Sequence, residues 1–147
     1  MINPFIKAVI TVLKQLGFSS IERKGLSATG REVHAEGVLL NLGIIGDKNG
    51  NVVYEIDLEA AKKISSTMMG TKIEELNDMA KSALSEMSNM LTAHSSTNLA
   101  SNGISVDISV PTMFYGKNIS VEMSRETAIK IDFDIDNFKM SVYVSMD

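Results

Sequence analysis

The residue pair with the clearest chemical potential in this sequence is Glu86 and Asn89, three positions apart in a long segment of helical periodicity. In an α-helix this spacing puts both side chains on one flank, on successive turns. Asn has one acceptor and two donors on a short side chain, so it can bind and orient a water molecule. Glu offers a carboxylate that can pair with a lysine of another protein. Ser82, one turn before Glu86, is small and lets a partner approach the helix.

A helix of this kind can insert into another protein's active site and supply a positioned water there. The catalytic gain would come from orientation and not from new covalent chemistry. The alternative interpretation of the pair is an ordinary solvated helix flank. Glu74 and Asn77 repeat the spacing at the start of the same segment, and we interpret them as cap and first-turn residues, since Asn and Glu favour helix N-termini.

A long helix has to position Glu86 and Asn89. The periodicity predicts a start near Ile73, with Thr71 as the cap, and an end near Ala100. We expect one face of this helix to be buried, because apolar side chains recur on it every three to four residues. The residues of this predicted core face are Leu76, Met79, Ala80, Ala83, Met87, Met90, Leu91 and His94.

Two shorter helices are also predicted. The first has Asn3 as a cap and Pro4 at its first helical position, and it ends at Gly17. The second begins after Asp57 as the cap and runs to about residue 69, where Gly70 ends it.

The remaining segments predict antiparallel strands, because apolar and polar residues alternate along them. In the first block, residues 33–42 and 52–54 flank turn residues at 47–50, which is typical of a hairpin. In the second block the alternating segments are 104–110, 119–123, 129–135 and 138–144. The sequence therefore predicts a single α+β domain over residues 1–147: an N-terminal helix and an antiparallel sheet in two blocks, with a helix pair between them that includes the long helix of the site.

Composition excludes several classes of function. The 147 residues contain 14 Lys and Arg against 18 Asp and Glu, a net charge of −4, which disfavours binding to nucleic acid or anionic membranes. The absence of cysteine excludes disulfides, iron–sulfur clusters and a cysteine nucleophile. No apolar run approaches the roughly 18 residues of a membrane span and no signal peptide is recognisable, so we expect a cytoplasmic protein. Asp132, Asp134 and Asp136 alternate along one strand, and we interpret them as its solvent-facing side and not as a metal site.

The residues around Glu86 and Asn89 resemble a known family. The run Ala-Lys-Ser-Ala-Leu-Ser-Glu-Met-Ser-Asn-Met-Leu, residues 80–91, is similar to the active-site helix of the CheC/CheX/FliY phosphatases of bacterial chemotaxis. Ser82 stands at the family's small polar position one turn before the Glu. The resemblance is greatest to the CheX branch and extends over most of the chain, from the opening helix and the hairpin to the segment that ends at Pro111.

This resemblance implies an activity and a role for each site residue. Such proteins hydrolyse the phosphoaspartate of the chemotaxis response regulator CheY and so terminate its signal to the flagellar motor. Asn89 would orient the attacking water, Glu86 would pair with a lysine of the regulator, and Ser82 would lie at the partner-binding surface. The regulator would supply Mg²⁺, so no cofactor of the chain's own is expected. CheC members carry a second such pair on another helix, whereas the helix at 5–16 contains no Glu, so we expect one site.

The resemblance also implies a homodimer joined along sheet edges. The regular, apolar segments 129–135 and 138–144 are the strands that we expect at such an edge. Two other functions stay open at this point. One is a non-catalytic binding module for a response regulator or a flagellar switch component, and the other is a purely structural dimerisation domain.

Overall fold

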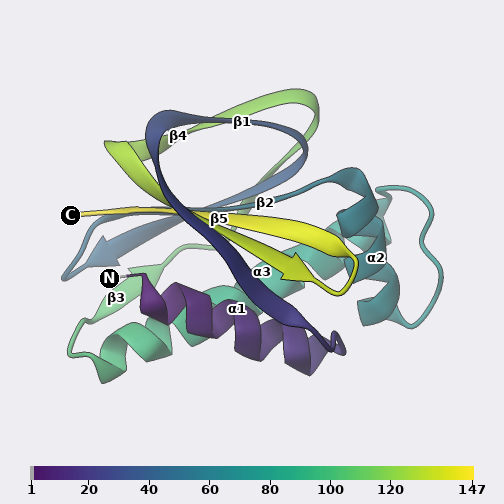
Figure 1. Cartoon of the computed structure of the whole chain (residues 1–147), viewed down its shortest axis with the longest axis horizontal. Helices are drawn as coiled ribbons and strands as arrows, with labels where there is room; N and C mark the ends of the chain where they lie inside the picture. The colour runs from purple at the N-terminus through teal and green to yellow at the C-terminus, as the bar shows by residue number, and fades with distance from the viewer. Residues whose placement is uncertain (1) are drawn as a thin grey trace.

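One antiparallel sheet carries three helices on one of its faces in the computed structural model, which describes residues 2–147 (Figure 1). This arrangement confirms the predicted α+β fold. The elements follow the order α1 (Asn3–Leu16), β1 (Ile21–Gly46), β2 (Gly50–Ile56), α2 (Leu58–Met69), α3 (Asp78–Ser101), β3 (Val106–Ile108), β4 (Thr112–Ile135) and β5 (Phe138–Met146). Within the described residues, none of the three helices has the length and hydropathy of a transmembrane segment.

Two very long strands, β1 and β4, shape the sheet. They pair from Ile21 opposite Ile135 to Asn41 opposite Thr112, with three register shifts along the way. Because such irregularities bend and twist a strand, the pair arches over the face of the sheet that the helices leave open (Figure 1). This arch comprises residues 29–37 of β1 and 116–128 of β4, where the two strands pair only with each other. After the arch, β1 also pairs with β2, so its second half lies between β2 and the start of β4.

The predicted strand boundaries need correction on β1, β3 and β4. Segment 33–42 is only part of β1, which begins at Ile21. Segments 119–123 and 129–135 belong to one continuous strand, and segment 104–110 shortens to a strand of three residues. The polar residues 124–127 interrupt the alternation because they are exposed in the arch, yet the backbone stays extended through them.

The helices and the arch bury the two faces of the sheet. On β1, Val38, Leu40 and Leu42 join the main core between sheet and helices. Leu39, between them, faces the other way and belongs to a second cluster under the arch, together with Val33, Val53, Val121, Met123, Ala128 and Tyr143. The middle of the sheet is therefore apolar on both faces, and the molecule has three layers: helices, sheet and arch.

The helix boundaries agree with the sequence patterns except at two N-termini. As expected, Asp57 caps α2 by accepting from the Ala60 amide at 2.7 Å, and Gly17 ends α1 in a left-handed conformation. Helix α1, however, has Ile2 at its N-cap, so Asn3 is its first helical residue and not its cap.

The start of α3 was predicted too early. The Ile73 amide donates to Ser66 Oγ at 2.9 Å, which holds residues 71–77 as a loop beside α2. Helix α3 begins only after Asn77, whose side chain accepts from the Ala80 amide at 2.9 Å. Asn77 is therefore the cap, and Glu74 lies in the loop outside the helix.

The strands expected at a dimer edge lie inside the sheet. Strand β5 is hydrogen-bonded to β2 on one side and β4 on the other, and the second half of β4 lies between β5 and β1. The sheet ends instead at the first half of β1 and, on the opposite side, at β3 and the start of β4. The prediction that segments 129–135 and 138–144 form an edge is wrong.

Candidate functional site

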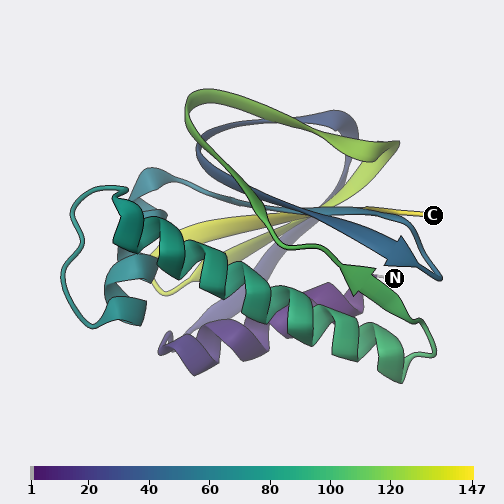
Figure 2. The same ribbon diagram turned by 180° about the vertical axis from the view of Figure 1, so that it is seen from behind.

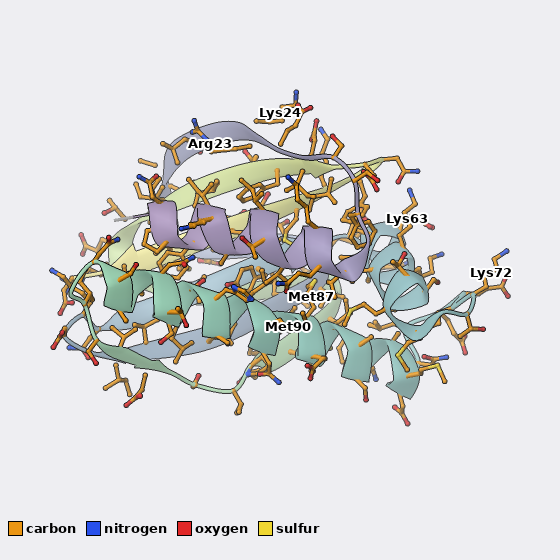
Figure 3. All side chains as sticks on the ribbon, turned by 90° about the horizontal axis from the view of Figure 1, so that it is seen from below. Arg23, Lys24, Lys63, Lys72, Met87 and Met90 are labelled. Carbon is orange, nitrogen blue, oxygen red and sulfur yellow. The ribbon has the colours of Figure 1, made fainter. Side chains whose placement is uncertain are left out.

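Helix α3 positions Glu86 and Asn89 on the outside of the helical layer. It lies beside α1 against the sheet, with Met87 between the two helices (Figure 3). Its buried residues are Ala80, Ala83, Leu84, Met87, Ser88, Leu91, Thr92, Ser95 and Leu99. Ser82, Glu86 and Asn89 fall outside this face and are exposed, as the sequence predicted.

The predicted core face of α3 needs correction. Leu76 lies in the loop before the helix, and Met79 was expected in the core but is 46% exposed. His94 is only half-buried. Leu84 and Ser88, which the sequence pattern did not place in the core, take part in the buried face instead.

The site is an open hollow of about 420 Å³ between α3 and the start of β4. Figure 2 shows α3 in front, with the chain from β3 into β4 running beside it. The hollow is lined by Lys81, Ser82, Ser85, Glu86, Asn89, Met113 and Tyr115. The three predicted site residues, Ser82, Glu86 and Asn89, therefore share one surface depression.

Glu86 and Asn89 have unused hydrogen-bonding capacity. Among the described residues, neither side chain takes part in a hydrogen bond or an ion pair, and both face solvent. Their buried neighbours are bonded within the helix: Ser88 Oγ donates to the Ser85 carbonyl and Thr92 Oγ1 to the Asn89 carbonyl, both at 2.9 Å. The helix thus presents a free carboxylate and a free amide outward.

Lys81 and Tyr115 also belong to the hollow, and neither was predicted from the sequence as a site residue. Lys81 Nζ donates to Tyr115 Oη at 3.0 Å and lies 4.3 Å from the centroid of the same ring. The hydrogen bond to Tyr115 raises the pKa of Lys81 above its ordinary value. Lys81 stands next to Ser82 in the family-like run, which is a sequence signal. Tyr115 gives no such signal, because its position depends on how β4 pairs with β1.

The other candidate groups have structural roles. Asp136 accepts from the Ser20 amide at 2.7 Å and also from the Ser19 amide, and Asp132 accepts from Ser141 Oγ at 2.7 Å. His34 is exposed and pairs with Glu32. Residues 2–147 contain no group of three or more His, Asp and Glu side chains that could hold a metal ion.

Solved structures of chemotaxis proteins share this fold. The structure matches the chemotaxis protein CheX from Desulfovibrio desulfuricans with a TM-score of 0.90 and 20% identity, over 99% of this chain and 98% of that one. It also matches a chain of the CheX-CheY-BeF3-Mg²⁺ complex from Borrelia burgdorferi with a TM-score of 0.82 and 25% identity, over 99% and 96% of the two chains.

Sequence comparison then identifies the family. The model of the chemotaxis phosphatase CheX family matches residues 38–134, which include all of α3, and the chain belongs to this family. Over 82 residues the chain is 33% identical to the CheY-P phosphatase CheX of Thermotoga maritima. This match covers 55% of the chain and 53% of the Thermotoga protein, about half the length of that relative. The resemblance predicted from the residues around Glu86 and Asn89 is confirmed.

Proposed function

We propose that this protein is a phosphatase that removes the phosphoryl group from the phosphoaspartate of a CheY-type response regulator. The observation that carries the proposal is the exposed, unpartnered Glu86–Asn89 pair in an open hollow on α3. Membership of the chemotaxis phosphatase CheX family supports it, and so does the solved complex of a CheX relative with CheY, BeF3 and Mg²⁺.

In this proposal, Asn89 prepares the nucleophile. Its amide binds a water through one donor or acceptor and holds the oxygen in line with the phosphorus. The water oxygen bonds to phosphorus as the bond from phosphorus to the aspartyl oxygen breaks, and a proton passes from the water to the released phosphate. Phosphoryl transfer of this type depends on positioning and charge neutralisation more than on covalent participation of the protein.

Glu86 and Ser82 would act on docking. The Glu86 carboxylate, three positions from Asn89, is free to pair with a lysine of the regulator and thereby set the depth at which α3 enters. Ser82 is exposed and small, and it leaves the helix surface open to the partner. The regulator would bring Mg²⁺ together with its phosphoryl group, and the Borrelia complex, in which CheX is bound with CheY, BeF3 and Mg²⁺, supports this division of roles.

The test is the lifetime of a phosphorylated CheY-type regulator with and without this protein. We expect the parent to shorten that lifetime and Asn89→Ala to lose about a hundredfold in rate, because a misplaced nucleophile costs that much. Asn118→Ala, at an exposed asparagine of the arch, is the matched control and should match the parent. An Asn89→Ala protein as active as the parent would contradict the mechanism, provided that it is folded by circular dichroism.

The competing function is a binding module without catalysis. Saturable binding to the phosphorylated regulator, with no change in the lifetime of its phosphoaspartate, would favour this function over a phosphatase.

The proposal has two further parts. One is that two copies of the chain associate along a free edge of the sheet, and the first half of β1 offers such an edge. The other is a cytoplasmic site of action, which the sequence also led us to expect.

A further inference from the structure

Lys81 is the fourth residue of α3, and its side chain reaches across to β4. So close to a helix N-terminus, the helix dipole does not favour a basic side chain. It takes part in no ion pair of at most 4.0 Å with any carboxylate of the described residues, although the charge of Asp78 acts on it. Its only polar side-chain partner among the described residues is Tyr115, on a strand 34 positions away.

Tyr115 fixes the position of the Lys81 ammonium. The phenol oxygen accepts one of its three protons, and the ring lies close enough to its charge for a cation–π contact. Half of the Tyr115 surface is exposed, so this contact closes one end of the hollow without burying the charge. Two donors of the ammonium stay available to a visiting group.

Lys81 and Glu86 lie on opposite flanks of α3. At about 100° per residue, Lys81 and Glu86 are about 140° apart around the helix axis, and Asn89 falls between them. Lys81 is on the flank nearest β4, because it contacts Tyr115, and Glu86 is therefore on the outer flank. The hollow consequently presents a positive charge on one flank of α3 and a negative charge on the other, both on the N-terminal side of Asn89.

We infer that Lys81, held by Tyr115, binds a carboxylate of the phosphorylated regulator and, together with Glu86, fixes the direction in which the regulator lies across α3. This inference rests on the proposed function. A strongly hydrated ammonium gains most from a charged acceptor, which makes a carboxylate the expected contact. A regulator that docks in the reverse direction would put its carboxylate against Glu86 and its lysine against Lys81, and both contacts would be repulsive.

The test measures binding separately from turnover. The probe is a CheY-type regulator loaded with beryllium fluoride and Mg²⁺, titrated against the parent, Lys81→Glu, Lys81→Met and Lys81→Arg. We expect Kd to rise about tenfold for Lys81→Glu and about threefold for Lys81→Met, with Lys81→Arg close to the parent. Tyr115→Phe keeps the ring and loses the acceptor, so its Kd should rise less than that of Lys81→Met.

Lys7→Glu supplies the control for net charge. It makes the same change at an exposed lysine of α1 that does not line the hollow, and we expect its Kd within twofold of the parent. In hydrolysis assays, Lys81→Glu should raise KM with kcat nearly unchanged, and its difference from the parent should shrink as salt is added.

The outcomes separate this inference from the proposed function. A Lys81→Glu protein that binds within twofold of the parent overturns the role of Lys81, even when hydrolysis proceeds normally. An equal loss of affinity for Lys7→Glu and Lys81→Glu also overturns it, because net charge then explains the effect. Weakened binding by Lys81→Glu alone supports it, even when the parent does not accelerate hydrolysis and the proposed phosphatase activity fails.

Discussion

At the scale of single residues, the polar side chains of α3 fall into two groups. Five of them are bonded inside the molecule: those of Ser88, Thr92, Ser96, Asn98 and Ser101 each donate to a backbone carbonyl. Glu86 and Asn89 have no such partner among the described residues. Side chains that contribute nothing to internal bonding can be replaced with little loss of stability, so the effects of their substitution report on function.

Glu86→Gln tests the docking role of the carboxylate. The substitution keeps the size of the side chain and removes its charge, so the expected pairing with a regulator lysine weakens. We expect KM to rise about tenfold while kcat falls less than about threefold. Steady-state hydrolysis of the phosphorylated regulator measures both. A fall in kcat as large as that of Asn89→Ala, at unchanged KM, would show instead that Glu86 acts in the chemical step.

Tyr54→Phe tests a buried hydroxyl that lies near Ser95 but makes no well-formed hydrogen bond among the described residues. Burial raises the pKa of Tyr54. Above pH about 10 the unfolded chain releases this proton while the folded protein keeps it, so the parent loses about 1.4 kcal/mol of unfolding free energy per pH unit from this group. Below that pH the group contributes no pH dependence, and removing an unbonded hydroxyl should change stability by less than about 1 kcal/mol.

Urea unfolding of the parent and Tyr54→Phe at pH 8 and pH 11 measures this effect. We expect the variant to gain stability relative to the parent at the higher pH. Other groups that titrate in this range, including Tyr143, are present in both proteins and cancel in the comparison. An equal difference in stability at the two pH values would contradict the prediction.

At the scale of elements, local signals predicted most helix ends, while pairing decided the strands. Asp57, Gly17 and Gly70 act within one turn of their own helices, so their roles are visible in the sequence. The continuity of β4 depends on β1, which pairs with it across the exposed residues of the arch. Glu86 and Asn89 lie on one helix, so their spacing in the sequence was enough to find them. The contact of Lys81 with Tyr115 joins α3 to β4, so the sequence alone could not predict it.

Asn77→Ala tests the corrected start of α3. The substitution removes the acceptor for the Ala80 amide, and loss of such a cap costs about 1 kcal/mol. Glu74→Ala, in the loop, should leave stability nearly unchanged, since Glu74 is exposed and pairs only with exposed Lys72. Thermal unfolding of the two variants measures the difference. Equal destabilisation by both would indicate that the helix begins earlier, as the apolar periodicity alone suggested.

At the scale of the whole molecule, the arch and the hollow meet at one pair of glycines. Gly37 and Gly116 lie opposite each other in β1 and β4, at backbone φ angles of 126° and 144°. A Cβ on Gly37 would lie 2.5 Å from the Ile56 carbonyl oxygen, which leaves no room for a side chain. Directly beyond this pair, Tyr115 lies opposite Val38 and contacts α3. The bend of β1 and β4 at these glycines therefore determines where Tyr115, which lines the hollow, lies against α3.

The free edges of the sheet determine how two copies can associate. The segment 21–30 of β1 is bonded to β4 on one side only, and Leu26 within it is 49% exposed. If two copies pair along this edge, a negative charge at position 26 lies near its symmetry mate and repels it, because a two-fold interface repeats each residue on both sides.

Sedimentation equilibrium tests this geometry. We expect the parent to sediment at twice the chain mass of 16.0 kDa and Leu26→Glu to shift toward the monomer. Leu58→Glu, at a leucine of similar exposure on α2, is the control and should stay dimeric. A parent that is monomeric at all working concentrations would contradict the dimer. If Leu26→Glu is as dimeric as the parent, the interface does not lie at this edge. It then lies at the opposite edge, at β3 and the start of β4, beside the hollow that contains Asn89.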